Sequence, residues 1–188
     1  MSAGWIEARR HLLVIAGTDI HPFSRLTEWA DAWAAEHPDD DVLVQHGYTP
    51  EPQRARAVEM FTPAELADAL AGADVVVCHG GPGTISTVRA SGLQPVVLAR
   101  DPDRGEHVDS HQQRFARWAG DRGLADIAED VDALPAAVEA AAARGRGDSA
   151  PAAQLEATVQ ALRDEISTLL ARGPRRRRIP MLRRRRRR

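Results

Sequence analysis

Two short segments of the chain hold the side chains best suited to binding and acting on a ligand. The first, residues 75–92, reads VVVCHGGPGTISTVRASG: an apolar strand breaks into a glycine-rich turn and then becomes a helix. At Gly80, Gly81 and Gly83 the missing Cβ lets the backbone approach a ligand closely. The helix N-terminus behind them offers free N–H groups and partial positive charge, and Thr84 adds a hydroxyl. The segment predicts an anion site suited to a pyrophosphate, with a plain tight turn as the alternative.

The second segment, residues 105–112, reads GEHVDSHQ and follows the next apolar run. It holds two imidazoles, two carboxylates, a hydroxyl and an amide, all able to make hydrogen bonds with a polar ligand. The alternative is a simple helix N-terminus capped by Asp109 or Ser110. The two segments together are more informative than either one alone.

Two other chemistries suggested by these residues each lack a required group. HGGPG after a strand is also typical of the oxyanion turn of some α/β-hydrolases, which need a later G-x-S-x-G elbow. No serine after the turn stands in that frame: Ser86, Ser91, Ser110, Ser149, Ser167. His107 and His111 are four residues apart, as in a zincin, but Val108 stands where the zincin glutamate is required. We therefore expect neither a serine hydrolase nor a metal site.

Apolar runs alternate with amphipathic stretches throughout the first 144 residues. Strands are expected at residues 11–18, 41–47, 57–61, 75–78, 95–100 and 124–128. Helices are expected at residues 23–36, 63–71, from the glycine turn to Ser91, 108–123 and 131–144. This alternation predicts an α/β fold: a Rossmann-like parallel sheet of about six strands with helices on both faces. Ligands of such sheets bind beyond the carboxyl ends of the strands, where both segments lie.

The remaining residues form two predicted appendages to the domain of residues 1–147. Residues 148–171 predict an amphipathic helix whose apolar seam is Leu155, Val159, Leu162, Ile166 and Leu169. This seam either packs back on its own domain or is offered to a partner. Residues 172–188 form a disordered tail with 11 of the chain's 25 arginines and no acidic residue.

Charge and composition exclude several classes of protein. Residues 1–171 carry 14 arginines against 27 acidic residues, so we expect no binding of nucleic acid by the body. The single Cys78 excludes an internal disulfide framework and favours a reducing, cytoplasmic compartment. No apolar run reaches the roughly 18 to 20 residues of a membrane span, and we expect no signal peptide. The arginine tail could hold the protein on an anionic membrane surface, its own acidic body or a partner.

The two segments together resemble the C-terminal, donor-binding domain of glycosyltransferase family 28. The similarity lies in HGGPGTI, SGLQPVVLAR and GEHVDSHQQRFA and covers roughly residues 10–144. Within the family the chain is most similar to the small soluble subunits of two-component exopolysaccharide and dolichol-type glycosyltransferases. These carry an H-x-G-x-G-[ST] turn and a G-E-H-x-x-[DS]-H-Q loop. The resemblance implies a single C-terminal half of a GT-B fold.

The resemblance also implies roles for individual residues. The donor diphosphate would be held by the glycine turn, Gly80, Gly81, Pro82, Gly83 and Thr84, with Gly17 and Thr18 facing the same cleft. The sugar and phosphate would be reached by Glu106, His107, Asp109, His111 and Gln112. His79 or His107 would assist catalysis. Thr87 stands where relatives often have a glutamate that grips the ribose, and it could make only one weaker hydrogen bond.

The activity implied is transfer of a hexosyl group from a UDP-sugar to a lipid-linked or glycan acceptor. A membrane-anchored subunit would supply the acceptor half, and no metal or other cofactor would be needed. The alternative is a non-catalytic module that binds a nucleotide sugar or assembles such a complex. Either protein would lie in the cytoplasm, at the inner face of the membrane if the tail adheres to it.

Overall fold

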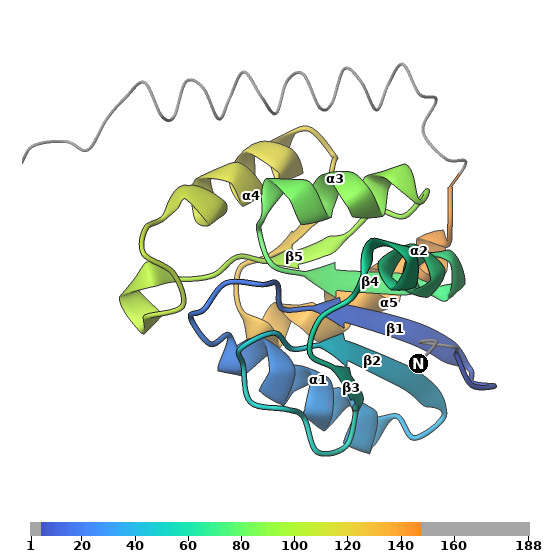
Figure 1. The fold of residues 1–188 in the computed structure, drawn as a ribbon. Helices are drawn as coiled ribbons and strands as arrows, with labels where there is room; N and C mark the ends of the chain where they lie inside the picture. The colour runs from blue at the N-terminus through green and yellow to red at the C-terminus, as the bar shows by residue number, and fades with distance from the viewer. Residues whose placement is uncertain (1–4, 148–188) are drawn as a thin grey trace, which may run out of the picture.

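A six-stranded parallel sheet forms the centre of the protein, in the strand order β3-β2-β1-β4-β5-β6 (Figure 1). We describe residues 5–147 of a computed structural model. The strands are β1 (Arg10–Ile15), β2 (Asp40–Gln45), β3 (Arg56–Val58), β4 (Val75–Cys78), β5 (Val96–Leu98) and β6 (Asp126–Ala128). Among the described residues no helix is long and apolar enough to span a membrane.

Helices cover both faces of the sheet (Figure 1). One face carries α1 (Ser24–Glu36) and α5 (Leu134–Arg144), and the other carries α2 (Pro63–Gly72), α3 (Pro82–Ala90) and α4 (His111–Asp121). Short 3-10 helices lie at Pro102–Arg104 and Val131–Ala133. Neighbouring strand residues point into opposite cores, as with Leu12 and Leu13. The predicted α/β fold is thereby confirmed.

Local sequence signals set most element boundaries. Thr62 and Glu65 form the predicted capping box of α2: the Glu65 N–H donates to the Thr62 hydroxyl, and the Glu65 carboxylate accepts from the Thr62 N–H. The predicted start of α4 at residue 108 was wrong, since the helix begins at His111. The Asp109 carboxylate accepts the His111 N–H at 2.9 Å, which leaves residues 107–110 as a loop. Similarly, β1 ends at Ile15, three residues earlier than expected.

The order of the strands defines where a ligand can enter. From β1 the chain proceeds to β2 on one side, whereas β4, which comes later, lies on the other side of β1. The loops after β1 and β4 therefore diverge from each other at the carboxyl edge of the sheet. Such a reversal of strand order opens a crevice, which is the usual ligand site of open α/β sheets.

The turn after β4 closes over the imidazole of His79. A Cβ on Gly17 would lie 2.8 Å from Nε2 of His79, and a Cβ on Gly81 would lie 2.2 Å from its Cε1. The Gly81 N–H donates to Nδ1 at 3.1 Å, so Nε2 carries the proton and donates to the Thr84 hydroxyl at 3.0 Å. Burial is the main cause that lowers the pKa of His79 to about 4. His79 is thus a neutral spacer between the two ligand loops.

Because the His79 ring fills the space beneath Gly81, we expect Gly81→Ala to lower the free energy of unfolding by about 1–3 kcal/mol. Gly83→Ala is the matched control, since a Cβ there meets nothing within 4 Å and alanine favours a helix. Urea unfolding at neutral pH measures the free energy of unfolding of the two variants. Equal stabilities of the two variants would contradict this account of the turn.

The low pKa of His79 predicts a stability that depends on pH. Between pH 6.5 and about 4, His79 is protonated in the unfolded chain but stays neutral in the folded protein. The free energy of unfolding therefore falls as the pH falls through this window, by on the order of 3 kcal/mol from this residue. We expect His79→Gln to have a lower free energy of unfolding than the wild type at pH 7. We also expect its free energy of unfolding to depend less on pH between 6.5 and 4. Urea titrations from pH 4.5 to 7.5 test it, and parallel profiles for both proteins would refute it.

Candidate functional site

A cavity of about 310 Å³ lies at the crevice between the β1 and β4 loops. Its lining contains His79 and most of the predicted diphosphate contacts: Gly17, Thr18, Gly81, Pro82, Gly83 and Thr84. The helix α3 starts at this cavity with Gly81 as its N-cap, and no side chain caps it within the described part of the chain. Pro82 has no N–H and the Gly81 N–H donates to His79, which leaves the amides of Gly83 and Thr84 as the ones available to an anion.

Gln45 holds the β1 loop in place, a role that the sequence analysis missed. Its buried amide forms two bonds with one residue: the Gly17 N–H donates to Oε1, and Nε2 donates to the Gly17 carbonyl, both at 3.0 Å. Nε2 also lies 3.0 Å from the Glu59 carbonyl. The available signal was a polar residue inside the otherwise apolar run DVLVQ.

A buried arginine joins the loop after β1 to the second segment. Arg100, only 1% exposed, donates to the carbonyls of Ala16 at the end of β1, His21 in the following loop and Glu106 in the second segment. Burial lowers the pKa of Arg100, while the carboxylates of Asp19 and Glu106 oppose that effect. The guanidinium therefore fixes the loop after β1 and the loop before α4 against the carboxyl edge of the sheet.

The carboxylate of Glu106 points into the protein and not into the cleft. It accepts from Nε of Arg25 at 2.7 Å and Nη2 at 2.9 Å, and from the Asp101 N–H at 2.8 Å. Glu106 itself is 5% exposed. We had expected a donor contact here, but the geometry fits a residue that positions the loop of residues 101–110.

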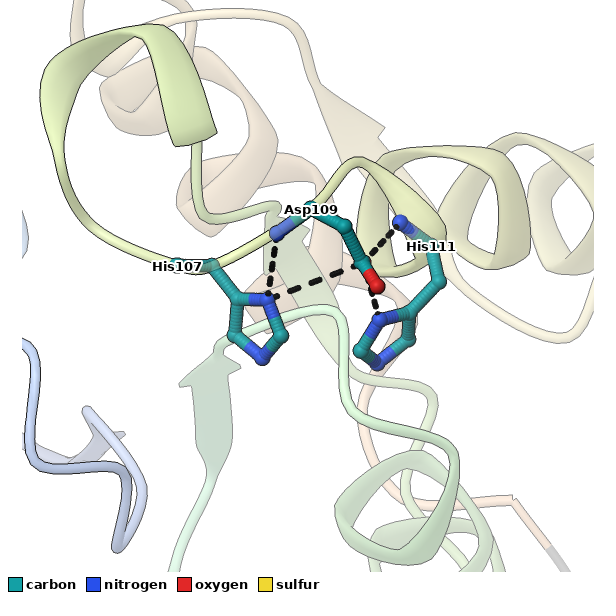
Figure 2. Close-up of side chains that lie close together, drawn as sticks. All are labelled: His107, Asp109 and His111. Atoms are coloured by element: carbon teal, nitrogen blue, oxygen red, sulfur yellow. Dashed lines mark hydrogen bonds and ion pairs between the residues drawn. The ribbon is translucent and has the colours of Figure 1, made fainter. Parts of the chain in front are cut away.

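A chain of imidazoles and carboxylates runs along the second segment. Asp19 accepts from Nδ1 of His21 at 2.6 Å and lies 3.3 Å from Nε2 of His107. On the other side of that ring, the Asp109 N–H donates to Nδ1 at 3.3 Å, and the Asp109 carboxylate contacts Nδ1 of His111 (Figure 2). The sequence analysis missed Asp19 and His21, although both follow the predicted β1 turn.

Hydrogen bonds keep both carboxylates of this chain ionised. Burial alone would raise the pKa of Asp19, but bonds from the backbone and ring of His21 and the charge of His107 hold it below its ordinary value. Asp109 is similar: burial raises its pKa, and bonds from the backbone and ring of His111 lower it by more. The second segment therefore presents imidazoles oriented by fixed negative charges.

His107, Asp109 and His111 could also hold a metal ion. Each offers one ligand atom, and these atoms lie within 4.8 Å of one another, with the side chains turned to the same side of the loop (Figure 2). Two imidazoles and a carboxylate would suit zinc. The same groups satisfy one another by hydrogen bonds without an ion. The expectation of a metal-free site thus stays a prediction.

The two predicted segments meet through Gly80 and Gln112. A Cβ on Gly80 would lie 2.9 Å from the Gln112 carbonyl, so glycine lets α4 approach the β4 turn. The buried Gln112 amide lies 3.3 Å from Nδ1 of His79. Thr87 does not line the cavity, and neither do Gly80 or the predicted residues of the second segment. The Thr87 hydroxyl instead donates to the Gly83 carbonyl at 2.9 Å.

Comparisons with known proteins agree with this geometry. Residues 11–170 match the model of the glycosyltransferase family 28 C-terminal domain. Over 98 residues, 48% of this chain, the sequence is 39% identical to UDP-N-acetylglucosamine--N-acetylmuramyl-(pentapeptide) pyrophosphoryl-undecaprenol N-acetylglucosamine transferase of Verminephrobacter eiseniae (strain EF01-2). The match covers 26% of that relative, so the chain aligns with about a quarter of its length.

Solved structures show the same architecture. The glycosyltransferase of kitacinnamycin matches with a TM-score of 0.53 and 24% identity, over 88% of this chain and 43% of that one. The calicheamicin glycosyltransferase CalG4 matches with a TM-score of 0.52 and 22% identity, over 92% of this chain and 47% of that one. The sheet is thus one half of a GT-B fold. Since the family model matches most of the chain, the protein belongs to glycosyltransferase family 28, whose C-terminal domain it contains.

Proposed function

We propose that this chain is the donor-binding and catalytic half of a glycosyltransferase that transfers a hexosyl group from a UDP-sugar to a lipid-linked or glycan acceptor. The observation that carries the proposal is the uncapped N-terminus of α3. It opens into the cavity between the β1 and β4 loops, beside the oriented imidazoles of the second segment. This combination supplies amides for a diphosphate and polar groups for a sugar.

In this scheme the diphosphate lies against Gly81, Gly83 and Thr84, with Gly17 and Thr18 on the opposite wall. The bond between the anomeric carbon and the diphosphate oxygen breaks, and a bond from that carbon to the acceptor oxygen forms. The amides stabilise the negative charge that develops on the leaving nucleoside diphosphate. The sugar is oriented by Asp109, His111 and Gln112.

The acceptor hydroxyl must lose a proton, and we assign its uptake to His107. Nε2 of His107 lies 3.3 Å from Asp19, and Nδ1 accepts the Asp109 N–H at 3.3 Å, a long bond that the acceptor hydroxyl would have to displace. His79 is less suited to this role. Both of its nitrogens are engaged inside the turn, and its low pKa makes it a weak base. We therefore assign His79 a positioning role.

The second candidate is a module that binds the nucleotide sugar without catalysing transfer. The internal engagement of His79 and Glu106 favours it, because two of the predicted contacts are thereby unavailable to a substrate. In both schemes the acceptor half is a separate membrane-anchored subunit. That part of the proposal rests on the resemblance to two-component enzymes.

We expect the chain, reconstituted with its partner, to bind a UDP-sugar in calorimetry and Gly83→Val to abolish that binding. The added side chain would occupy the open space in front of the α3 amides without disturbing the fold. Thr87→Val is the matched control on the same helix and should bind normally, since Thr87 lies outside the cavity. In the same pair, His107→Asn should slow turnover by about 10²- to 10⁴-fold.

Each outcome separates the candidates. The absence of UDP-sugar binding by the wild-type pair would refute both. Normal binding with unchanged turnover in His107→Asn and His79→Gln would favour the non-catalytic module. A loss of affinity in Thr87→Val equal to that in Gly83→Val would show that the donor lies along α3 and not in the cavity.

The arginine tail lies outside the described residues, and we propose that it binds anionic lipid. Each arginine near such a surface contributes about 1 kcal/mol, so removing residues 173–188 should weaken binding strongly. Flotation with vesicles containing phosphatidylserine measures this, with neutral vesicles as the control. An unaltered flotation profile after the deletion would eliminate the proposal.

A further inference from the structure

An apolar groove between α2 and α3 adjoins the donor cavity, with which it shares Phe61 and Leu66, but none of its lining residues has a role in the proposed reaction. Its volume is about 760 Å³, more than twice that of the donor cavity. The walls come from Phe61, Pro63, Leu66, Ala67, Leu70 and Ala71 on the α2 side and from Thr87 and Ala90 on α3. Both helices lie side by side on the same face of the sheet (Figure 1).

The helices around this groove lack the charged surface expected of solvent-facing helices. The exposed residues of α2 are small and apolar except for one: Pro63, Ala64, Ala67, Asp68 and Ala71. Those of α3 are uncharged: Gly83, Thr87 and Ala90. On α4, which lies on the same face of the sheet, every exposed residue is charged: Arg114, Arg117 and Asp121. Small side chains allow another helix to approach closely, so α2 and α3 present a surface suited to a covering helix.

The chain leaves the described region at one end of this groove. The Arg146 guanidinium donates to the carbonyls of Leu70, Ala71 and Ala73 at the C-terminal end of α2, and to the Ser91 carbonyl after α3. The Gly147 N–H donates to the Gly92 carbonyl at 3.2 Å. These bonds fix the exit point between the C-terminal ends of both helices, so the following residues start at the mouth of the groove.

The length of the following segment fits the groove. The apolar seam from Leu155 to Leu169 would span about 22 Å as a helix, whereas α2 and α3 are about 15 Å and 14 Å long. Residues 148–154 are a short connection to it. Starting from the C-terminal ends of α2 and α3, a helix in the groove would run antiparallel to both and cover them over their whole length.

We propose that residues 155–169 dock their apolar seam into the groove between α2 and α3 of the same chain. The segment then acts as an intrachain cover for the otherwise open faces of these two helices. This inference goes beyond the proposed function, because it concerns a groove whose residues have no role in the proposed reaction. It also implies that the arginine tail begins near the N-terminal end of α3, on the side of the molecule where the donor would bind.

Hydrogen exchange of the full-length chain, read by mass spectrometry, tests the proposal. We expect residues 155–169 to exchange at least about tenfold more slowly than the arginine tail. Ala67→Glu in the groove and Leu162→Glu in the seam should each remove this protection. The matched controls are Ala64→Glu, exposed on α2 outside the groove, and Ala157→Glu, outside the seam, and both should retain it.

Unchanged exchange of the central strands β1, β2 and β4, which the groove does not include, verifies in each variant that the domain is folded. The proposal is overturned if residues 155–169 exchange as fast as the tail in the wild type, or if Ala67→Glu leaves their protection intact. Protection that appears only at concentrations where light scattering shows a dimer would assign the groove to a second copy. Protection that appears only with the membrane-anchored partner would assign it to that subunit, and either result contradicts intrachain docking.

Discussion

The buried guanidinium of Arg100 is the interaction on which the candidate site depends. The three carbonyls that accept its hydrogen bonds belong to the end of β1, the loop after it and the loop before α4, which no strand pairing holds together. A buried carbonyl that loses its donor costs about 1–3 kcal/mol, so removing the guanidinium would leave three such costs at once. Arg25 and Glu106 complete the network, and Asp19 adds a second negative charge near it. The loop after β1 and the loop before α4 are therefore held together by one side chain just beyond the end of β5.

A second constraint is steric. The His79 ring occupies the space between the β1 and β4 loops, so Gly17 and Gly81 must lack side chains for the loops to close. Gly17 also has a φ of +96°, which favours glycine independently. Gly83 has no such neighbour within 4 Å. These glycines are thus required for different purposes. Gly17 and Gly81 make room for the protein's own His79 ring, whereas Gly83 leaves open space in front of the α3 amides.

Much of the fold could be predicted from the sequence, because strand and helix periodicities are local signals. The capping box of Thr62 and Glu65, the glycine turn and the order of elements are all of this kind. The pairing of Arg25 with Glu106 is not, since 81 residues separate them and either side chain alone is typical of a solvated surface. The contact of Asp19 with His107 was equally invisible in the sequence, because it depends on the order of the strands in the sheet. The placement of Thr87 also required the structure, because one helix can present its first turn to the cavity and its second to the groove.

The charge of the chain limits how a donor can be held. Residues 1–171 carry 14 arginines against 27 acidic residues, so their net field repels a nucleoside diphosphate. That repulsion is screened within about 8 Å at physiological ionic strength, whereas hydrogen bonds act at contact. An anionic donor must therefore be bound by short-range contacts, and at this cavity the amides of Gly83 and Thr84 at the start of α3 can supply them. A glycine turn at a helix N-terminus is thus an arrangement that can bind an anion despite the acidic body.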